Sequence, residues 1–132
     1  MTTFDRLLHS AAMEPVPQRL RFVFAAVELP ADASAAQREA FAQGRGGYPV
    51  PRMCVDKAPQ DIASFAALRE ESQRMGADWS LLFAASMAGS PEDVPTSEDA
   101  QKPLEKMVEA IRMGNFSECI VFDAQGESLQ LA

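Results

Sequence analysis

Two long apolar runs constrain the fold of this chain more than any other feature of its sequence. The first is Phe22–Val27, and the second is the nearly continuous run Trp79–Met87. Neither run shows the apolar and polar alternation of a strand with one solvated face, so each is typical of a strand that is covered on both faces. We therefore expect both runs to lie in the middle of one sheet, between amphipathic helices.

Helical and strand patterns alternate along the chain, with proline or glycine at most of their boundaries. This order favours an α/β or α+β fold, with a single mixed sheet of about five strands and helices packed on it, in one domain that covers residues 1–132. The expected helices are Thr3–Met13, a short helix capped by Asp32 or Ser34 that ends near Ala42, Pro59–Gly76 and Thr96–Gly114; the further strands are Val50–Val55, Cys119–Asp123 and Ser128–Leu131.

The charge of the chain argues against nucleic acid as a partner. Twelve Lys and Arg residues stand against nineteen Asp and Glu residues, which gives a formal net charge of −7 at pH 7. A field of this sign repels polyanions unless the basic residues gather on one face. The arginines are scattered along the sequence, and no nucleic-acid partner is expected.

No targeting or membrane segment is expected either. Met1–Gln18 contains charged residues and lacks the apolar core of a signal peptide. The run Phe22–Val27 is far shorter than the roughly 20 residues that span a bilayer. Cys54 and Cys119 have no Cys-x-x-Cys spacing, which agrees with two reduced thiols in a cytoplasmic protein.

The sequence contains no recognisable catalytic or metal-binding motif. His9 is the only histidine and lies on the first expected helix, where a surface position is the simplest interpretation. The segment Gly44–Gly47 follows a helix and lacks the Lys and Ser or Thr of a phosphate-binding loop, so it is interpreted as a linker or a mobile flap. No catalytic residue, metal or cofactor is predicted.

The segment from Arg52 to Lys57 is the candidate site. It ends an expected strand and leads into a helix, and in open α/β sheets ligands bind at the carboxyl ends of strands. The alternative is structural, with Asp56 as a helix cap and Cys54 as a small buried side chain. The candidate ligand-binding residues are Arg52, Cys54, Asp56 and Lys57.

Three stretches, Gln18–Ala25 with the following Glu28–Pro30, Met53–Lys57, and Met107–Ile111 with the following Gly114–Asn115, together carry a resemblance to a known family. They resemble a family of small proteobacterial proteins of unknown function, some of which carry the name ribonucleotide reductase alpha subunit. The resemblance covers nearly the whole chain and implies a compact α/β fold. Reductase chemistry needs a thiyl-forming cysteine, a reducing cysteine pair and a large barrel, which two distant cysteines in 132 residues do not supply.

These observations predict a non-enzymatic cytosolic domain that binds a protein partner or associates with itself, as a homodimer through a sheet edge or a helix face. The alternative is a small enzyme or ligand sensor whose site lies around Arg52–Lys57 and is covered by the glycine segment. A third class, an accessory subunit of a larger assembly, predicts an exposed apolar patch around Phe116 or Tyr48.

Overall fold

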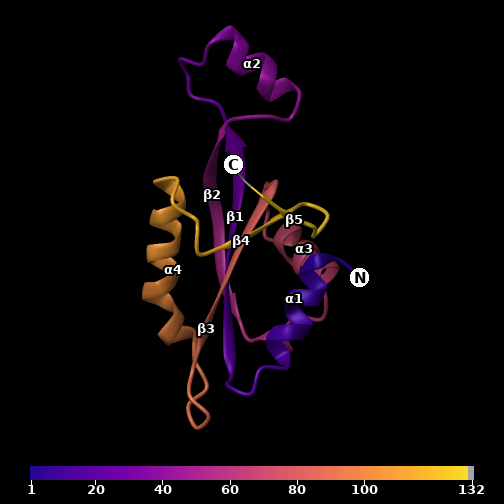
Figure 1. Ribbon diagram of the computed structural model, residues 1–132, viewed down its shortest axis with the longest axis vertical. Coiled ribbons are helices and arrows are strands. Elements are labelled where there is room, and N and C mark those ends of the chain that lie inside the picture. The colour runs from indigo at the N-terminus through magenta and orange to yellow at the C-terminus, as the bar shows by residue number, and fades with distance from the viewer. Residues whose placement is uncertain (131–132) are drawn as a thin grey trace.

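The computed structural model describes residues 1–130, and its centre is one five-stranded sheet with the strand order β2-β1-β3-β4-β5 (Figure 1). The two apolar runs form β1 and β3, each of which has a strand on both sides, so the prediction that they lie inside one sheet is confirmed. The strands are β1 (Gln18–Glu28), β2 (Tyr48–Lys57), β3 (Leu81–Ala88), β4 (Ile120–Asp123) and β5 (Ser128–Leu129).

Helices cover both faces of the sheet, which confirms the predicted α+β fold. In Figure 1, α1 (Thr3–Ala12) and α3 (Phe65–Arg74) lie on one side of the sheet and α4 (Ser97–Arg112) lies on the other. A 3₁₀ turn, η1 (Pro59–Asp61), precedes α3. No helix within residues 1–130 is both long and apolar enough to cross a membrane.

The sheet differs from the prediction in one respect: every strand pair within residues 1–130 is antiparallel, whereas we expected a mixed sheet. Alternation of helices and strands suggested parallel crossovers. Instead, α2 (Ala35–Ala42) is inserted in the hairpin that joins β1 to β2. After α4, the chain runs back to the middle of β3, where Ile120 is opposite Ala84, so β4 lies antiparallel to β3.

The third helix begins later than predicted. Instead of one helix from Pro59, η1 is followed by an extended residue at Ile62, and α3 starts at Phe65. The Ser64 hydroxyl accepts the backbone N–H of Ala67 and acts as the N-cap, which fixes the start of α3. The predicted strand Ser128–Leu131 is present as β5 up to Leu129, and Leu131 lies outside the described residues.

The side chains of β1 alternate between two separate cores. Phe22 and Phe24 belong to the core beneath α1 and α3, and Val23 and Ala25 belong to the core beneath α4. All four are fully buried, which explains why the run shows no polar alternation. In the first core, the ring of Phe4 lies 5.2 to 5.7 Å from three other phenylalanine rings, those of Phe22, Phe65 and Phe122.

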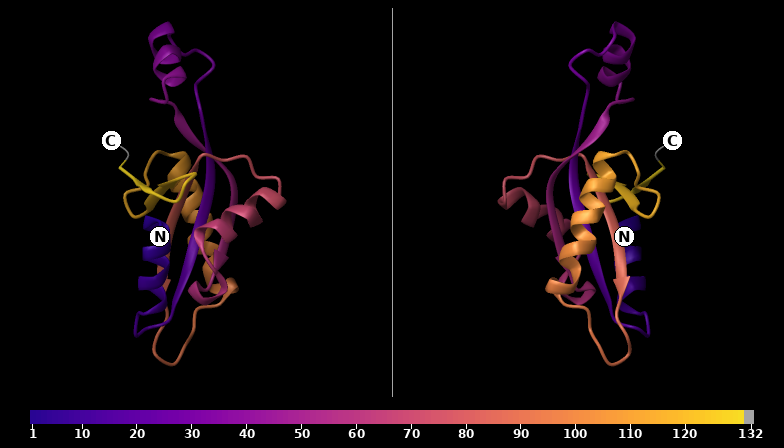
Figure 2. Two further views of the ribbon diagram at one scale, coloured as in Figure 1. Left: turned by 90° about the vertical axis from the view of Figure 1, so that its right-hand side faces the viewer. Right: turned by 90° about the vertical axis from the view of Figure 1, so that its left-hand side faces the viewer.

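The hairpin between β1 and β2 extends beyond the sheet as an arm, residues 29–47, that carries α2 at its tip (Figures 1 and 2). No residue of α2 is buried. The segment Gly44–Gly47 leads from α2 back into β2. At Gly47, φ is +84°, and a Cβ atom would lie 2.6 Å from the side chain of Val27, so only glycine fits where the arm rejoins the sheet.

The carboxylate of Asp5 connects the N-termini of two helices. One oxygen accepts the hydroxyl and the backbone N–H of Thr2 in a capping box on α1, at 2.9 and 3.2 Å. The other oxygen accepts the backbone N–H of Phe65, the first residue of α3, at 2.9 Å. The hydrogen bond from Phe65, and then those from Thr2, hold the pKa of Asp5 below its ordinary value of 3.8.

We predict that Asp5→Ala lowers the free energy of unfolding by about 1 kcal/mol at pH 7, as loss of a helix-capping group does. Because the folded-state pKa is lowered, this stabilisation is present above the unfolded-state pKa and is lost as the pH falls through the folded-state value. Urea denaturation from pH 7 to pH 2 measures it. The difference between wild type and Asp5→Ala should shrink at the acid end. A pH-independent difference would contradict this role, and Asp32→Ala on the arm is the control.

Candidate functional site

The structure does not bring the four sequence-predicted site residues to one point. Arg52 pairs with Glu28 of β1 at 2.7 Å, and Lys57 pairs with Glu71 of α3 at 3.0 Å. Asp56 pairs with Arg19 at 2.6 Å on the other face of the sheet, beneath α4. The rule of carboxyl-end sites applies to parallel strands, and β2 is an antiparallel edge strand.

Cys54 lies at the surface of β2 beside α4, where a small cavity of about 310 Å³ separates it from Leu104 and Val108. Desolvation, and then the negative charge of Asp56, raise the pKa of the Cys54 thiol above its ordinary value of 9.0. The thiol is therefore protonated at neutral pH and is a weak nucleophile. Ligand binding by the segment Arg52–Lys57 stays a prediction.

Asp56 has an evident structural role in this arrangement. Its side chain is 8% exposed, and it accepts both the guanidinium of Arg19 and the hydroxyl of Ser97 at the start of α4. The ion pair of Arg52 with Glu28 is instead exposed, at 45% and 43%. The two pairs join the same two strands and differ mainly in burial, so they make a matched comparison.

We predict that Asp56→Ala costs about 3 kcal/mol of unfolding free energy, because it leaves the guanidinium of Arg19 buried without its carboxylate. Arg52→Ala should cost at most about 1 kcal/mol, since its ion pair is exposed to solvent. Chemical denaturation of the two purified variants checks the difference. Equal costs would contradict a structural role for Asp56 and would favour a ligand-binding one.

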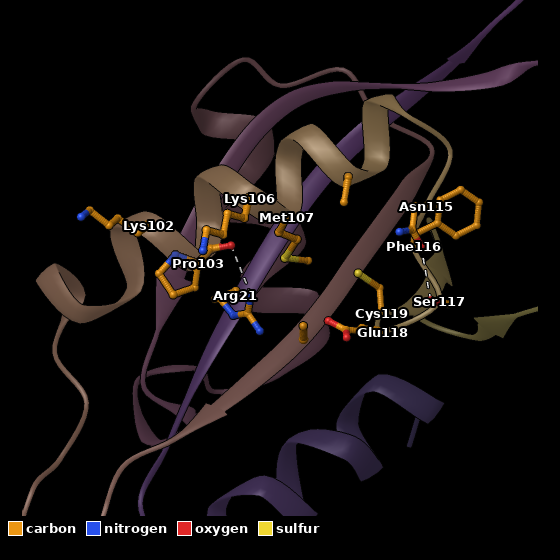
Figure 3. A pocket seen from close by; sticks show the side chains of 12 residues that line it. Arg21, Lys102, Pro103, Lys106, Met107, Asn115, Phe116, Ser117, Glu118 and Cys119 are labelled. Atoms are coloured by element: carbon orange, nitrogen blue, oxygen red, sulfur yellow. Dashed lines mark hydrogen bonds between the residues drawn. The ribbon is translucent and has the colours of Figure 1, made fainter.

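A different cavity, of about 470 Å³, lies between α4, the adjoining faces of β1 and β3, and the loop Met113–Cys119 (Figure 3). It forms because α4 packs mainly against β2 and β1 and leaves part of β3 to be covered by the loop. The loop is held down by Phe116, whose ring packs 5.2 Å from that of Phe83. Next to that contact, β3 offers only the small side chain of Ala85, and space remains.

Arg21 of β1 lies at the centre of this cavity (Figure 3). Its guanidinium donates two long hydrogen bonds of 3.3 Å, to the backbone carbonyls of Pro103 and Ser86. The third donor, Nε, is buried and has no acceptor among residues 1–130. A buried donor without a partner costs about 1–3 kcal/mol, so core stability alone does not account for an arginine at this position.

The register of β1 and β2 explains why Arg21 is left without a carboxylate. Arg19 and Arg21 point to the same face of the sheet, because side chains alternate along a strand. Arg21 is directly opposite Asp56, yet Asp56 pairs diagonally with Arg19. One carboxylate thus faces two guanidinium groups. Within the described part of the chain, no carboxylate lies at ion-pair distance from Arg21.

Further positive charge lies around the cavity. Lys102 and Lys106 of α4, two of the three lysines in the sequence, line it together with Arg21. Glu118 is the one carboxylate of the lining, so three cations stand against one anion in a chain whose net charge is −7. In Figure 3 the ammonium of Lys102 points away from Arg21, and that of Lys106 lies closer to it.

Cys119 contributes a neutral side chain to the cavity. Burial raises the pKa of its thiol above the ordinary value of 9.0; the positive charge of Arg21 opposes this shift, and Glu118 adds to it. In Figure 3 its sulfur points toward Met107 of α4. Because a buried protonated thiol behaves as a small apolar group, Cys119 belongs to the apolar part of the lining.

Comparison of the chain with protein-family models, with curated proteins and with solved structures found no match. Within residues 1–130, no group of three or more His, Cys, Asp or Glu side chains is close enough together to hold a metal ion. The geometry around Arg21 is therefore the basis for the functional proposal.

Proposed function

We propose that the protein is a non-enzymatic binding domain that holds a small anion at Arg21. The observation that carries this proposal is the half-buried guanidinium of Arg21 in a cavity, with two long hydrogen bonds to backbone carbonyls, an unsatisfied Nε and no carboxylate partner among residues 1–130. An anion that accepts from the terminal nitrogens, whose bonds to the two backbone carbonyls are long, would give this guanidinium the charged partner that it lacks. Such charge-assisted hydrogen bonds are the strong ones, and a planar guanidinium binds carboxylates and phosphates in this two-bond geometry.

The size and charge of the cavity support the same proposal. About 470 Å³ lies within the range of roughly 300–1,000 Å³ that small-molecule sites occupy. Lys106 would stabilise the bound anion from the side of α4 as a flexible point charge. Because Arg21 is half-buried whereas Lys106 is exposed, the charge of Arg21 would be screened less than that of Lys106.

Several predictions made from the sequence concern partners other than a small molecule, and they stay predictions. Phe116 is half-buried against Phe83, but Ile120 and Leu129, which line a surface hollow together with it, are exposed, and Tyr48 is 45% exposed at the base of the arm. The candidate apolar patch around Phe116 or Tyr48 therefore stays a prediction. Pro49 and Pro51 on β2 cannot donate backbone hydrogen bonds, which disfavours pairing of this edge with a second sheet. We retain self-association and cytoplasmic location as expectations of the proposal.

The direct test is Arg21→Met, which keeps an unbranched side chain but removes the charge and the unsatisfied donor. We predict that the variant loses the anion-induced rise in Tm and binds at least tenfold more weakly in calorimetry. The probes are sodium phosphate, acetate, benzoate and phenyl phosphate at constant ionic strength. Without ligand, the variant should be as stable as wild type or more so, because a buried unpaired donor has been removed.

Arg52→Met is the matched control, since it removes a guanidinium that is exposed and paired with Glu28. It should keep the full response to the anions. A response of Arg21→Met equal to that of wild type, or equal losses in the two variants, would contradict binding at Arg21 and indicate general charge effects.

A further inference from the structure

The cavity around Arg21 has a polar part and an apolar part, and this division points to one class of ligand. Resting on the proposed function, we infer that the ligand is an organic anion in which a single carboxylate or phosphate group is joined to a compact apolar body, an aromatic ring being the best fit. The anionic group lies at Arg21, and the body lies against α4 and the loop that follows it.

The apolar part is built from small and soft side chains. Met107 and Ala110 line it from α4, Ala85 lines it from β3, and Cys119 lines it from the end of the loop. Figure 3 shows Met107 and Cys119 on the side of Arg21 that faces the loop, and Lys102 and Pro103 on the other side. An apolar body joined to an anion at Arg21 would therefore extend toward the loop.

The two sulfur atoms favour an aromatic body over a polar one. Met107 is 5% exposed, and Cys119 carries a thiol whose pKa is raised by burial, so both are neutral at pH 7. Thioethers and neutral thiols contact the edges of aromatic rings favourably. At the far end, the Ser117 hydroxyl donates to the Asn115 side-chain oxygen at 3.3 Å, which leaves the Asn115 amide N–H groups for a polar substituent.

Size separates this ligand class from simple anions. Inorganic phosphate has five heavy atoms and would leave most of the 470 Å³ filled with water. A water molecule next to the side chains of Ala85 and Ala110 would have few hydrogen-bond partners. Its displacement by an apolar group of the ligand would therefore increase the affinity. A larger hydrophobic ligand class is less suited, because charged side chains, Glu118 and the two lysines, also line the cavity.

The experiment compares two matched pairs of probes by calorimetry on the full chain: acetate with benzoate, and methyl phosphate with phenyl phosphate. In at least one pair the aromatic member should bind at least tenfold more tightly than the methyl member. The pair with the higher affinity identifies the anionic group as carboxylate or phosphate. In Arg21→Met, both members of the pair should lose most of their affinity.

Ala110→Leu tests the position of the body, because it fills the apolar part without a change at Arg21. We expect it to weaken the aromatic member at least fivefold and to leave the methyl member within twofold. Ala36→Leu, at an exposed position of α2, is the control and should change neither. Cys119→Ser, a nearly isosteric change from an apolar to a polar group, should lower the preference for the aromatic member even if Ala110→Leu does not fold.

The outcomes separate the two proposals. If both members of each pair bind equally and both depend on Arg21, the inference of an apolar body is wrong and the anion site stands. If the aromatic member binds more tightly but neither Ala110→Leu nor Cys119→Ser affects it, the inference is also wrong. If no probe binds wild type more tightly than Arg21→Met, the anion site itself is wrong.

Discussion

The arrangement of this protein depends on the alternation of side chains along β1. The strand lies between two cores, so each residue faces either the α1 and α3 side or the α4 side. The same alternation that buries Val23 and Ala25 beneath α4 also directs Arg19 and Arg21 there. Asp56 satisfies Arg19 and closes one end of this face, and Arg21 stays inside with backbone carbonyls as its partners. Core packing alone does not explain a charged side chain in the incompletely filled space between α4 and the sheet.

Much of the fold could be predicted because its signals are local. The apolar runs Phe22–Val27 and Trp79–Met87 predicted β1 and β3, and the expected helix Thr96–Gly114 agrees with α4, whose N-cap is Thr96. The errors arose where tertiary contacts decide. The start of α3 depends in part on Asp5, sixty residues earlier, and the antiparallel order depends on where the chain returns after α4. Neither contact leaves a periodic pattern in the sequence.

The candidate site could not be predicted in the same way. Its residues come from β1, β3, α4 and the loop before β4. The three cations, Arg21, Lys102 and Lys106, do not form a recognisable sequence motif. One signal was present in the sequence. Arg21 lies two residues before Val23, so both side chains point to the same face of a strand that was expected to be buried on both faces. The segment Arg52–Lys57 drew attention instead because a rule for parallel sheets was applied to what is an antiparallel edge strand. Three of its four side chains are engaged in ion pairs.

The central claim is that the guanidinium of Arg21 binds an anion, and nuclear magnetic resonance of the arginine Nε–Hε groups observes this guanidinium directly. The Arg21 signal is assigned as the one missing from the Arg21→Met spectrum. Titration with benzoate or phenyl phosphate should shift this signal downfield and slow its exchange with water, while the signal of the exposed Arg52 stays in place. An Arg21 signal that does not move, or a shift confined to exposed arginines, would contradict the account.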